Sequence, residues 1–188
     1  MTAIKYLNLL VFFLLTSASA FCITTDELKK LEDSANQGDA EAQCNLGFCY
    51  YKGDGVPQDF KIAVSWYAKA AEQGHVKAQI SMGFCYIKGQ GVPKDPKKGV
   101  YWYTKAAEQG DAGAQSNLGY CYQRGQGVAK DLKKAVSLYR KAAEQGYAVA
   151  QYNLGICYES GSGVEVDFKK SAYWIKKSKE PRPVKDSK

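Results

Sequence analysis

The chain has 188 residues, a mean hydropathy of −0.40 and a formal net charge of +7, and this length allows one domain or a short array of repeats but not two ordinary domains. The excess positive charge is concentrated in residues 169–188, which carry eight basic and two acidic residues. Nucleic-acid binding needs cations concentrated on a folded face, so we predict no nucleic-acid partner and only a weak contact between residues 169–188 and an anionic surface.

Residues 1–20 have the features of a secretory signal peptide. Lys5 precedes an apolar run over residues 7–15, and the small residues Ala18 and Ala20 follow that run. The run is too short to span a bilayer comfortably. We therefore predict cleavage after Ala20, an exported protein that is periplasmic or secreted, and no transmembrane segment in the mature chain.

Residues 24–37 predict the first helix of the mature chain. Thr24 and Glu27 have the spacing of a capping box, in which each side chain accepts a hydrogen bond from the backbone N–H of the other residue. The segment matches the second helix of a two-helix unit that lacks its first helix. We therefore predict that residues 21–37 form an N-terminal capping helix.

A 36-residue period without gaps accounts for most of the remaining chain. Its four copies lie in register over residues 38–73, 74–109, 110–145 and 146–181. A repeat at this period predicts units that stack on one another, because one such unit cannot bury its apolar face alone. Residues 182–188 follow the last unit as a basic C-terminal tail.

The first half of each unit predicts a helix. In the first unit, Ala42, Leu46, Cys49 and Tyr50 fall at i, i+4, i+7 and i+8, which places them on one stripe of a helix. This helix is expected to end at Gly53, and equivalent residues recur in the other three units. No segment has the alternation expected of a strand, so we predict an all-α protein.

A second helix follows in each unit. Asp59 occupies the N-cap position, as do Asp95, Asp131 and Asp167 in the later units. Gly74 then ends the second helix of the first unit as a glycine C-cap. Each unit is therefore predicted to be a helix-turn-helix.

The glycine-rich turn over residues 53–59 lacks the features of a phosphate-binding loop. A P-loop needs a Lys-Ser/Thr pair, which is absent here, and it normally follows a strand. Asp59 would also place a carboxylate where the phosphate would bind. We predict instead that the glycines of this turn adopt left-handed backbone conformations.

A second set of glycines lies inside the predicted first helices, at Gly47, Gly83, Gly119 and Gly155. Each glycine costs about 1 kcal/mol relative to alanine in a helix, so a close approach must justify it. We expect aromatic rings of the paired second helix, such as those of Trp66, Trp102 and Trp174, to fill the space.

The pattern A-x-x-x-L-G-x-x-Y-x-x-G-x-G-V-x-x-D-x-x-x-A-x-x-W-Y-x-K-A-A-x-x-G resembles the Sel-one-like repeat, a longer relative of the tetratricopeptide repeat. The resemblance covers residues 24–181. It implies a right-handed α/α superhelical solenoid of four 36-residue repeats with an N-terminal capping helix. It also implies an adaptor or scaffold role in protein complexes, so that the expected partner is a protein or a peptide.

The sequence does not support catalysis. A cysteine-rich bacterial branch of this family has been described as penicillin-binding or penicillin-hydrolysing, but the S-x-x-K and K-T-G motifs of such serine chemistry are absent here. The single histidine, His75, stands at a variable turn position and is expected to be a surface residue. We predict that the protein is not an enzyme and uses no cofactor.

Four cysteines occupy one repeated position on the buried stripe: Cys49, Cys85, Cys121 and Cys157. Equivalent residues in stacked units lie about 8–10 Å apart, which exceeds the limit of about 7 Å between disulfide Cα atoms. These cysteines are therefore predicted to be inert thiols. No CxxC cluster is present, so we predict no metal site.

The other two cysteines are Cys22 and Cys44. If residues 25–37 and 40–52 form an antiparallel hairpin, Cys22 lies closer to Cys49 than to Cys44, so Cys22–Cys49 is a candidate disulfide. The cysteine-rich branch has disulfides that join one unit to the next. Cys44 resembles the downstream half of that pairing, but Ala35 and Asn36 occupy the upstream positions, so this bridge is not carried over.

Variation between units is confined to one face of the first helix, which holds Glu41, Cys44, Phe48, Tyr51, Lys52 and their copies. The resemblance to tetratricopeptide repeats implies that this face lines a concave groove. Its central strip would hold Phe48, Tyr51, Ile80, Phe84, Ile87, Tyr120, Tyr152 and Ile156. Beside the strip lie Asn45, Asn117 and Asn153, whose amides could bond to an extended peptide. In the alternative, Phe48, Phe84, Tyr120 and Ile156 pack between neighbouring first helices.

The leading hypothesis is an exported, non-catalytic adaptor whose groove binds a peptide or a partner's helix. One alternative is a protein that binds or hydrolyses cell-wall fragments or β-lactams, as suggested by the cysteine-rich branch. Another alternative is a tether that contacts an anionic surface through its basic C-terminal tail. The sequence does not identify the partner.

Overall fold

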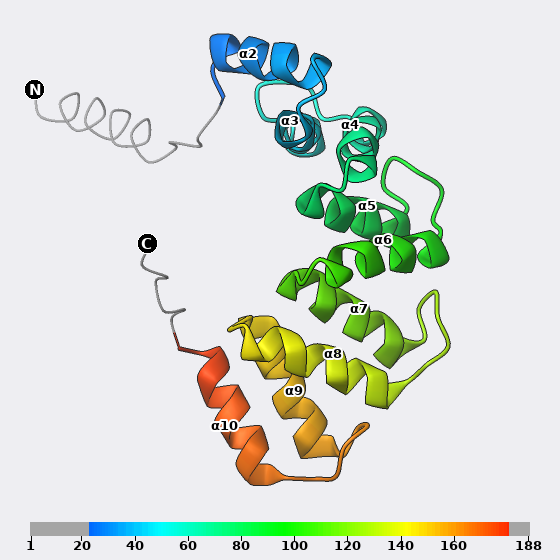
Figure 1. Cartoon of the computed structure of the whole chain (residues 1–188), viewed down its shortest axis with the longest axis vertical. Coiled ribbons are helices and arrows are strands. Elements are labelled where there is room, and N and C mark those ends of the chain that lie inside the picture. Colours follow the sequence, from blue (N-terminus) through cyan, green and yellow to red (C-terminus); the bar gives the residue numbers. More distant parts are fainter. Residues whose placement is uncertain (1–22, 181–188) are drawn as a thin grey trace, which may run out of the picture.

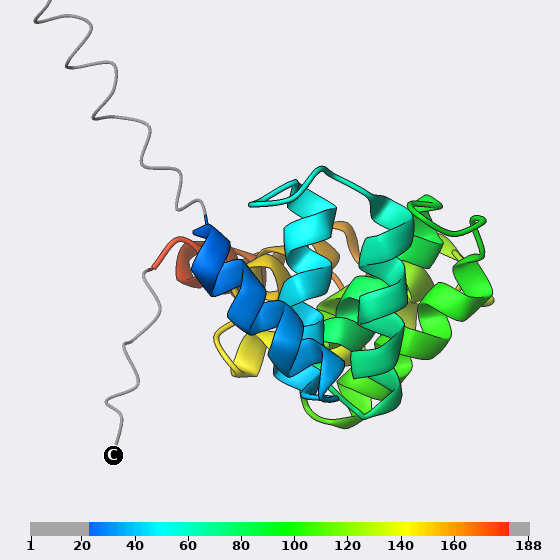
Figure 2. The ribbon, with the colours of Figure 1, turned by 90° about the horizontal axis from the view of Figure 1, so that it is seen from above.

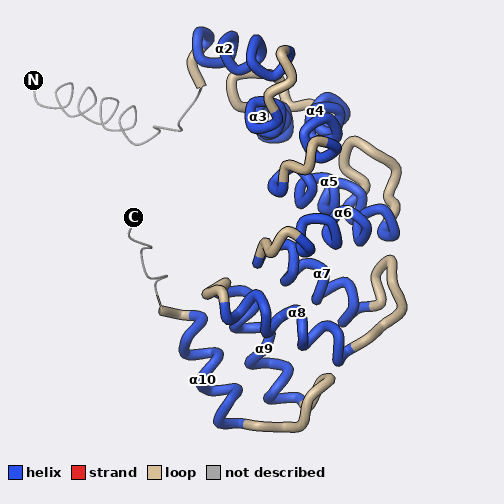
Figure 3. The backbone as a smooth tube through the Cα atoms, viewed as in Figure 1, coloured by secondary structure: helices blue, strands red, loops and turns tan. Residues whose placement is uncertain are grey.

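The computed structural model describes residues 23–180, which form nine helices and no strand (Figure 3). The predicted capping helix is α2 (Thr25–Asn36). The four units then contribute α3 (Ala40–Lys52) and α4 (Phe60–Glu72), α5 (Val76–Lys88) and α6 (Pro96–Glu108), α7 (Ala112–Arg124) and α8 (Leu132–Glu144), and α9 (Ala148–Ser160) and α10 (Phe168–Ser178). The signal peptide predicted over residues 1–20 lies outside the described residues.

The helices form a solenoid, which confirms the predicted all-α repeat fold. Each helix packs against the helices before and after it in the chain, and the array curves from α2 to α10 (Figure 1). Seen from above, α2 lies across α3 at one end of the array (Figure 2). Within residues 23–180, no helix is long and apolar enough to span a membrane.

Capping residues set the ends of the helices as the sequence predicts. Thr24 and Glu27 form the capping box at the start of α2. The aspartates before the second helices accept hydrogen bonds from backbone N–H groups, as Asp59 does from Lys61 and Ile62. Because these N–H groups have no partner inside the helix, each cap fixes where a helix begins.

The glycines of the turns have the predicted left-handed backbone, with φ of +78° at Gly53 and +71° at Gly55. The second glycine of each turn also allows a close approach between units. A Cβ atom on Gly91 would collide with the backbone carbonyl of Phe60, at the start of the second helix of the preceding unit. This position therefore requires glycine for both its conformation and its packing.

The glycines inside the first helices of units 1–3 make room for an aromatic ring of the paired helix, as expected, but each ring belongs to a tyrosine and not to one of the tryptophans, so the choice of tryptophan is wrong. In unit 4, Gly155 makes room for Ile175. A Cβ atom on Gly83 would lie 2.5 Å from Cδ1 of Tyr103, and one on Gly47 would lie 2.8 Å from Cδ1 of Tyr67. The tyrosines are buried, whereas Trp66 and Trp102 are only half-buried. One position along a helix turns the side chain by about 100°, which directs the tyrosine, not the adjacent tryptophan, at the paired helix.

The core consists of clusters that join each unit to the next. One cluster joins Cys44 of α3 and Tyr67 of α4 to Met82 and Cys85 of α5. Small residues such as Ala70, which is fully buried, allow the next unit to come close. Each unit is thus stabilised by apolar contacts with its neighbour, as expected for a solenoid.

Glutamines connect neighbouring units through a second set of contacts. Gln109 is the C-cap residue of α6. Its Nε2 donates to Oε1 of Gln79 in α5 at 2.9 Å and to the carbonyl oxygen of Gly74 at 2.9 Å. Gln79 is buried and donates in turn to the carbonyl oxygen of Ala71 in α4, at 3.2 Å. Such bonds satisfy buried polar groups while fixing the register between helices.

Candidate peptide-binding groove

Aromatic side chains form an exposed row along the first helices of units 1–3. Phe48 on α3, Phe84 on α5 and Tyr120 on α7 hold equivalent positions and are 50%, 37% and 45% exposed. A partner that covered these rings would gain about 25 cal/mol for each Å² of apolar surface removed from water. Repetition of exposed rings over adjacent helices is typical of an interaction surface.

A cavity of about 220 Å³ lies between α3 and α5. Five of the predicted groove residues line it together: Phe48, Tyr51, Ile80, Phe84 and Asn117. The ring of Tyr51 packs edge-on against that of Phe84, with centroids 6.4 Å apart, and its hydroxyl donates to Oε1 of Gln90 at 2.9 Å. These contacts hold Tyr51 in place, so this cavity has a fixed aromatic wall.

A second cavity, of about 320 Å³, lies between α5 and α7. Four predicted groove residues line it: Phe84, Ile87, Asn117 and Tyr120. Lys88, Lys94 and Gln126 also line this cavity, so its wall combines rings with cations and amides. The α3–α5 cavity has no charged residue in its lining, and the two cavities therefore differ in chemistry.

A third cavity, of about 730 Å³, lies between the capping helix α2 and α3, and Asn45 and Phe48 line it. The three cavities share residues, because Phe48 also lines the α3–α5 cavity, and Phe84 and Asn117 line both of the other two. We call this continuous surface, from α2 to α7, the first-helix groove. It brings together eight of the predicted residues: Asn45, Phe48, Tyr51, Ile80, Phe84, Ile87, Asn117 and Tyr120.

The three predicted residues of unit 4 lie elsewhere. Tyr152, Asn153 and Ile156 are on α9, and none of them lines these three cavities. Tyr152 is 49% exposed, whereas Cys44, its counterpart in unit 1, is buried. The prediction that Cys44 belongs to the variable exposed face is wrong, because it packs in the core that joins α3, α4 and α5.

Cations accompany the exposed rings, and the predicted set of site residues omitted them. Lys52 lies 5.8 Å from the ring centroid of Phe48, Lys88 lies 6.0 Å from that of Phe84, and Arg124 lies 5.7 Å from that of Tyr120. Residues four apart share one face of a helix, and a cation is attracted to the face of a ring. The signal for these pairs is an aromatic residue followed by a cation four positions later, repeated every 36 residues.

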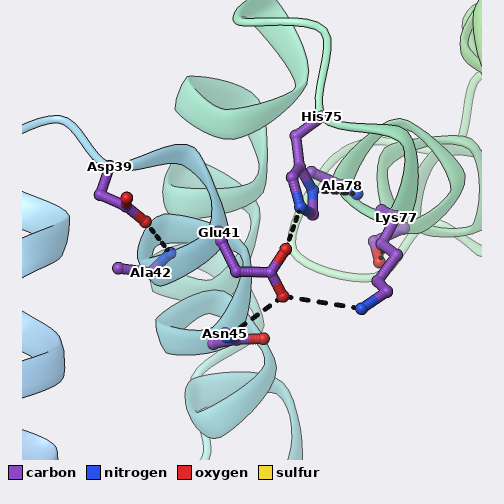
Figure 4. Close-up of polar contacts among 8 residues, drawn as sticks. Asp39, Glu41, Ala42, Asn45, His75, Lys77 and Ala78 are labelled. Atoms are coloured by element: carbon purple, nitrogen blue, oxygen red, sulfur yellow. Dashed lines mark hydrogen bonds and ion pairs between the residues drawn. The ribbon is translucent and has the colours of Figure 1, made fainter. Parts of the chain in front are cut away.

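His75 is part of a structural contact between units 1 and 2 (Figure 4). Its Nδ1 accepts a hydrogen bond from the N–H of Ala78, so it caps α5, and its Nε2 lies 2.8 Å from Oε2 of Glu41. Lys77 lies 3.6 Å from the other oxygen of Glu41. The hydrogen bond from His75, with the nearby charge of Lys77, lowers the pKa of Glu41. Both ring nitrogens of His75 are therefore engaged.

The described cysteines are buried thiols without a disulfide among them. Burial raises the pKa of Cys85 and of Cys121 to about 11, so little reactive thiolate forms near neutral pH. Cys22 lies outside the described residues, and the Cys22–Cys49 disulfide stays a prediction. Within residues 23–180, no group of three or more His, Cys, Asp or Glu side chains is arranged to hold a metal ion.

The sequence model of the Sel1 repeat matches residues 40–75, 76–111, 112–147 and 148–180. The chain belongs to the Sel1 repeat family. Each matched segment begins where a first helix begins, at the starts of α3, α5, α7 and α9. Sel1 repeats in general build scaffolds for protein interactions. A comparison with curated proteins gave no match.

Solved structures of other Sel1 repeat proteins resemble this one. A Sel1 repeat protein from Oxalobacter formigenes is 42% identical, with a TM-score of 0.78 over 81% of this chain and 61% of that chain. The protective antigen c5321 of uropathogenic Escherichia coli is 40% identical, with a TM-score of 0.78 over 80% of this chain and 32% of that chain. This Sel1 repeat protein thus spans less than two thirds of the length of either protein.

The cysteine-rich protein B of Helicobacter pylori is more distant. It is 27% identical, with a TM-score of 0.53 over 68% of this chain and 95% of that chain. The similarity supports a common repeat fold.

Proposed function

We propose that this Sel1 repeat protein is an exported, non-catalytic adaptor that binds a peptide or an extended segment of a partner protein in the first-helix groove. The observation that carries the proposal is the row of Phe48, Phe84 and Tyr120, whose rings are a third to a half exposed on the first helices of three successive units. Export rests on the signal-like residues 1–20 alone.

The shape of the groove supports an extended ligand. Equivalent positions in stacked units are about 10 Å apart, so the groove from α2 to α7 offers about 30 Å of length, enough for about nine extended residues at about 3.3 Å each. Asn117 lies at the junction of two cavities. Its amide could bond to the backbone of the ligand while the rings contact the side chains.

The groove is best tested by replacing its central apolar rings with charged side chains. Replacing both Phe84 and Tyr120 with glutamate should abolish capture of partners by crosslinking in the cell envelope, because charged side chains would replace the apolar surface. Both rings are exposed, so the fold should be retained, which circular dichroism would verify.

Tyr101→Glu provides the matched control. Tyr101 is 54% exposed on the second helix α6 and lines none of the three cavities, so this variant should capture the same partners as the wild-type protein. Unchanged capture by the Phe84→Glu, Tyr120→Glu protein would rule out the groove. Cell fractionation with and without residues 1–20 would test export separately.

A further inference from the structure

The first-helix groove contains cations that form no ion pair with a carboxylate of residues 23–180. Lys88 on α5 and Lys94 in the turn after α5 line the α5–α7 cavity. Lys52 and Arg124 line none of the three cavities but lie beside the rings of Phe48 and Tyr120. None of these four has a carboxylate of residues 23–180 within 4 Å, since the ion pairs in that range join Glu41 to His75 and Lys77, and Asp167 to Lys170. The α5–α7 part of the groove is therefore electropositive, whereas the lining of the α2–α3 cavity also contains the acidic residues Glu27 and Asp54.

The cations are also held close to the apolar contacts. Lys88 lies over Phe84, and Arg124 lies over Tyr120. Phe84 is shared between the wholly uncharged α3–α5 cavity and the α5–α7 cavity that Lys88 and Lys94 line. An apolar site and a cationic site thus lie side by side, with one ring between them.

The spacing of these two sites defines a ligand. The cavities occupy successive joints of the solenoid, about 10 Å apart, a distance that an extended peptide covers in about three residues. On the basis of the proposed function, we infer that the groove selects a peptide in which a large apolar residue and an aspartate or glutamate lie three positions apart. The apolar side chain enters the α3–α5 cavity, and the carboxylate meets Lys88 and Lys94.

Charge complementarity argues for an acidic side chain over a neutral one. A carboxylate that meets two lysines in a partly enclosed cavity forms charge-assisted hydrogen bonds. The same lysines repel a basic ligand, so they contribute to specificity as well as affinity. Glu41, an acid on the same helix face as Phe48, does not cancel this field, because His75 and Lys77 already pair with it.

The inference is tested with a phage-displayed library of random peptides of about twelve residues, a length that exceeds the groove at about 3.3 Å per residue. Selection against the wild-type mature protein should enrich sequences with the apolar-x-x-acidic pattern in either order. Synthetic copies of the enriched peptides, acetylated and amidated at their ends, should bind by fluorescence anisotropy, with an affinity that falls as salt rises.

Lys88→Glu should weaken binding of these peptides by about tenfold or more, because attraction becomes repulsion. Lys105→Glu is the matched control, since Lys105 lies 5.8 Å from the ring of Tyr101 on α6, an equivalent pair outside the groove, and this variant should bind as the wild type does. If Lys88→Glu lowers the melting temperature, Lys94→Glu, at an exposed turn position, serves as the second variant and should give the same loss.

The outcomes separate this inference from the proposed function. Enriched peptides that are apolar but show no acidic preference would overturn the inference and leave the groove intact as a binding site. Enriched acidic peptides that lose binding on amidation would also overturn it, since the groove would then recognise a terminal carboxylate. A selection that enriches no peptide would count against the proposed function itself.

Discussion

Units 1–3 and unit 4 have the same helix-turn-helix fold but differ in the side chains that they expose. In the first three units an aromatic residue precedes a cation by four positions, as in Phe84 and Lys88, whereas unit 4 has Ile156 and Ser160 in these places. The first helices of units 1–3 also have side-chain caps, while α9 begins after Tyr147 without a side-chain cap hydrogen bond.

Their interiors do not differ in this way. Ala150, Leu154 and Cys157 are as deeply buried in unit 4 as Ala78 and Cys85 are in unit 2. Positions that contact the next helix are constrained by packing density, whereas positions that face solvent are free to change. The comparison teaches that the fold extends over all four units, while the groove chemistry ends with the third.

The largest expected difference between the two regions concerns the internal glycines. Gly83→Ala in unit 2 should lower the free energy of unfolding by about 2 kcal/mol, because the new Cβ would press on the buried ring of Tyr103. Gly155→Ala in unit 4 should lower it by less, about 1 kcal/mol, because the new Cβ would meet Cγ1 of the half-buried Ile175 at 2.6 Å and backbone atoms of α10 at 3.2 and 3.3 Å, but alanine favours the helix and α10 is the last described helix. Urea unfolding measures both.

Ser81→Ala is a control for the first of these variants, because it alters the same helix at a half-buried position whose hydroxyl donates to the carbonyl oxygen of Lys77 in that helix at 3.0 Å. Its effect should be small. Equal losses for Gly83→Ala and Gly155→Ala would show that the last unit is packed as rigidly as the interior ones.

The next largest effect concerns the caps. Asp111→Ala should lower the free energy of unfolding by about 1 kcal/mol, because the carboxylate accepts a hydrogen bond of 2.7 Å from the N–H of Ala114. Asp111→Asn keeps an accepting oxygen and should lose much less. If the alanine and asparagine variants have the same free energy of unfolding, the hydrogen bond from Ala114 to the side chain at position 111 does not stabilise α7. The lack of such a cap in α9 would then make no difference between the units.

The smallest effect concerns the contact of Glu41 with His75 and Lys77, which joins units 1 and 2. The residues equivalent to Glu41 in units 3 and 4 are Gly113 and Val149, which have no carboxylate. Glu41 has a lowered pKa, chiefly through the hydrogen bond from His75. The contribution of the carboxylate is therefore present above its unfolded pKa and is lost as the pH falls through its folded pKa. Glu41→Gln should cost less than about 1 kcal/mol at neutral pH, as for other exposed pairs.

This difference between Glu41→Gln and the wild type should vanish in acid, below the folded pKa of Glu41. Urea unfolding at neutral and acidic pH measures it. A difference that persists unchanged in acid would mean that the side chain acts through packing and not through its charge.

Much of the fold and part of the site could be predicted, but the two depended on different signals. The caps at Asp59 and its copies and the left-handed glycines followed from local chemistry repeated four times. The aromatic strip was also visible, because its rings recur at a fixed spacing. Lys88 and Arg124, the copies of Lys52, were placed on the variable face but not among the predicted site residues, since a cation at a helix end has an ordinary local explanation. The cavity between α5 and α7 shows that Lys88 lines the groove together with Phe84.

The sequence by itself determined the period, the helices and the caps, because each of these depends on residues within one unit. Only the tertiary structure decided which neighbour each side chain meets: Tyr103 against Gly83, Cys44 in the core between units, and Tyr152 exposed in the last one. These outcomes depend on the angle at which each helix faces the next and on whether a further unit follows. Neither quantity is encoded in the pattern of a single repeat.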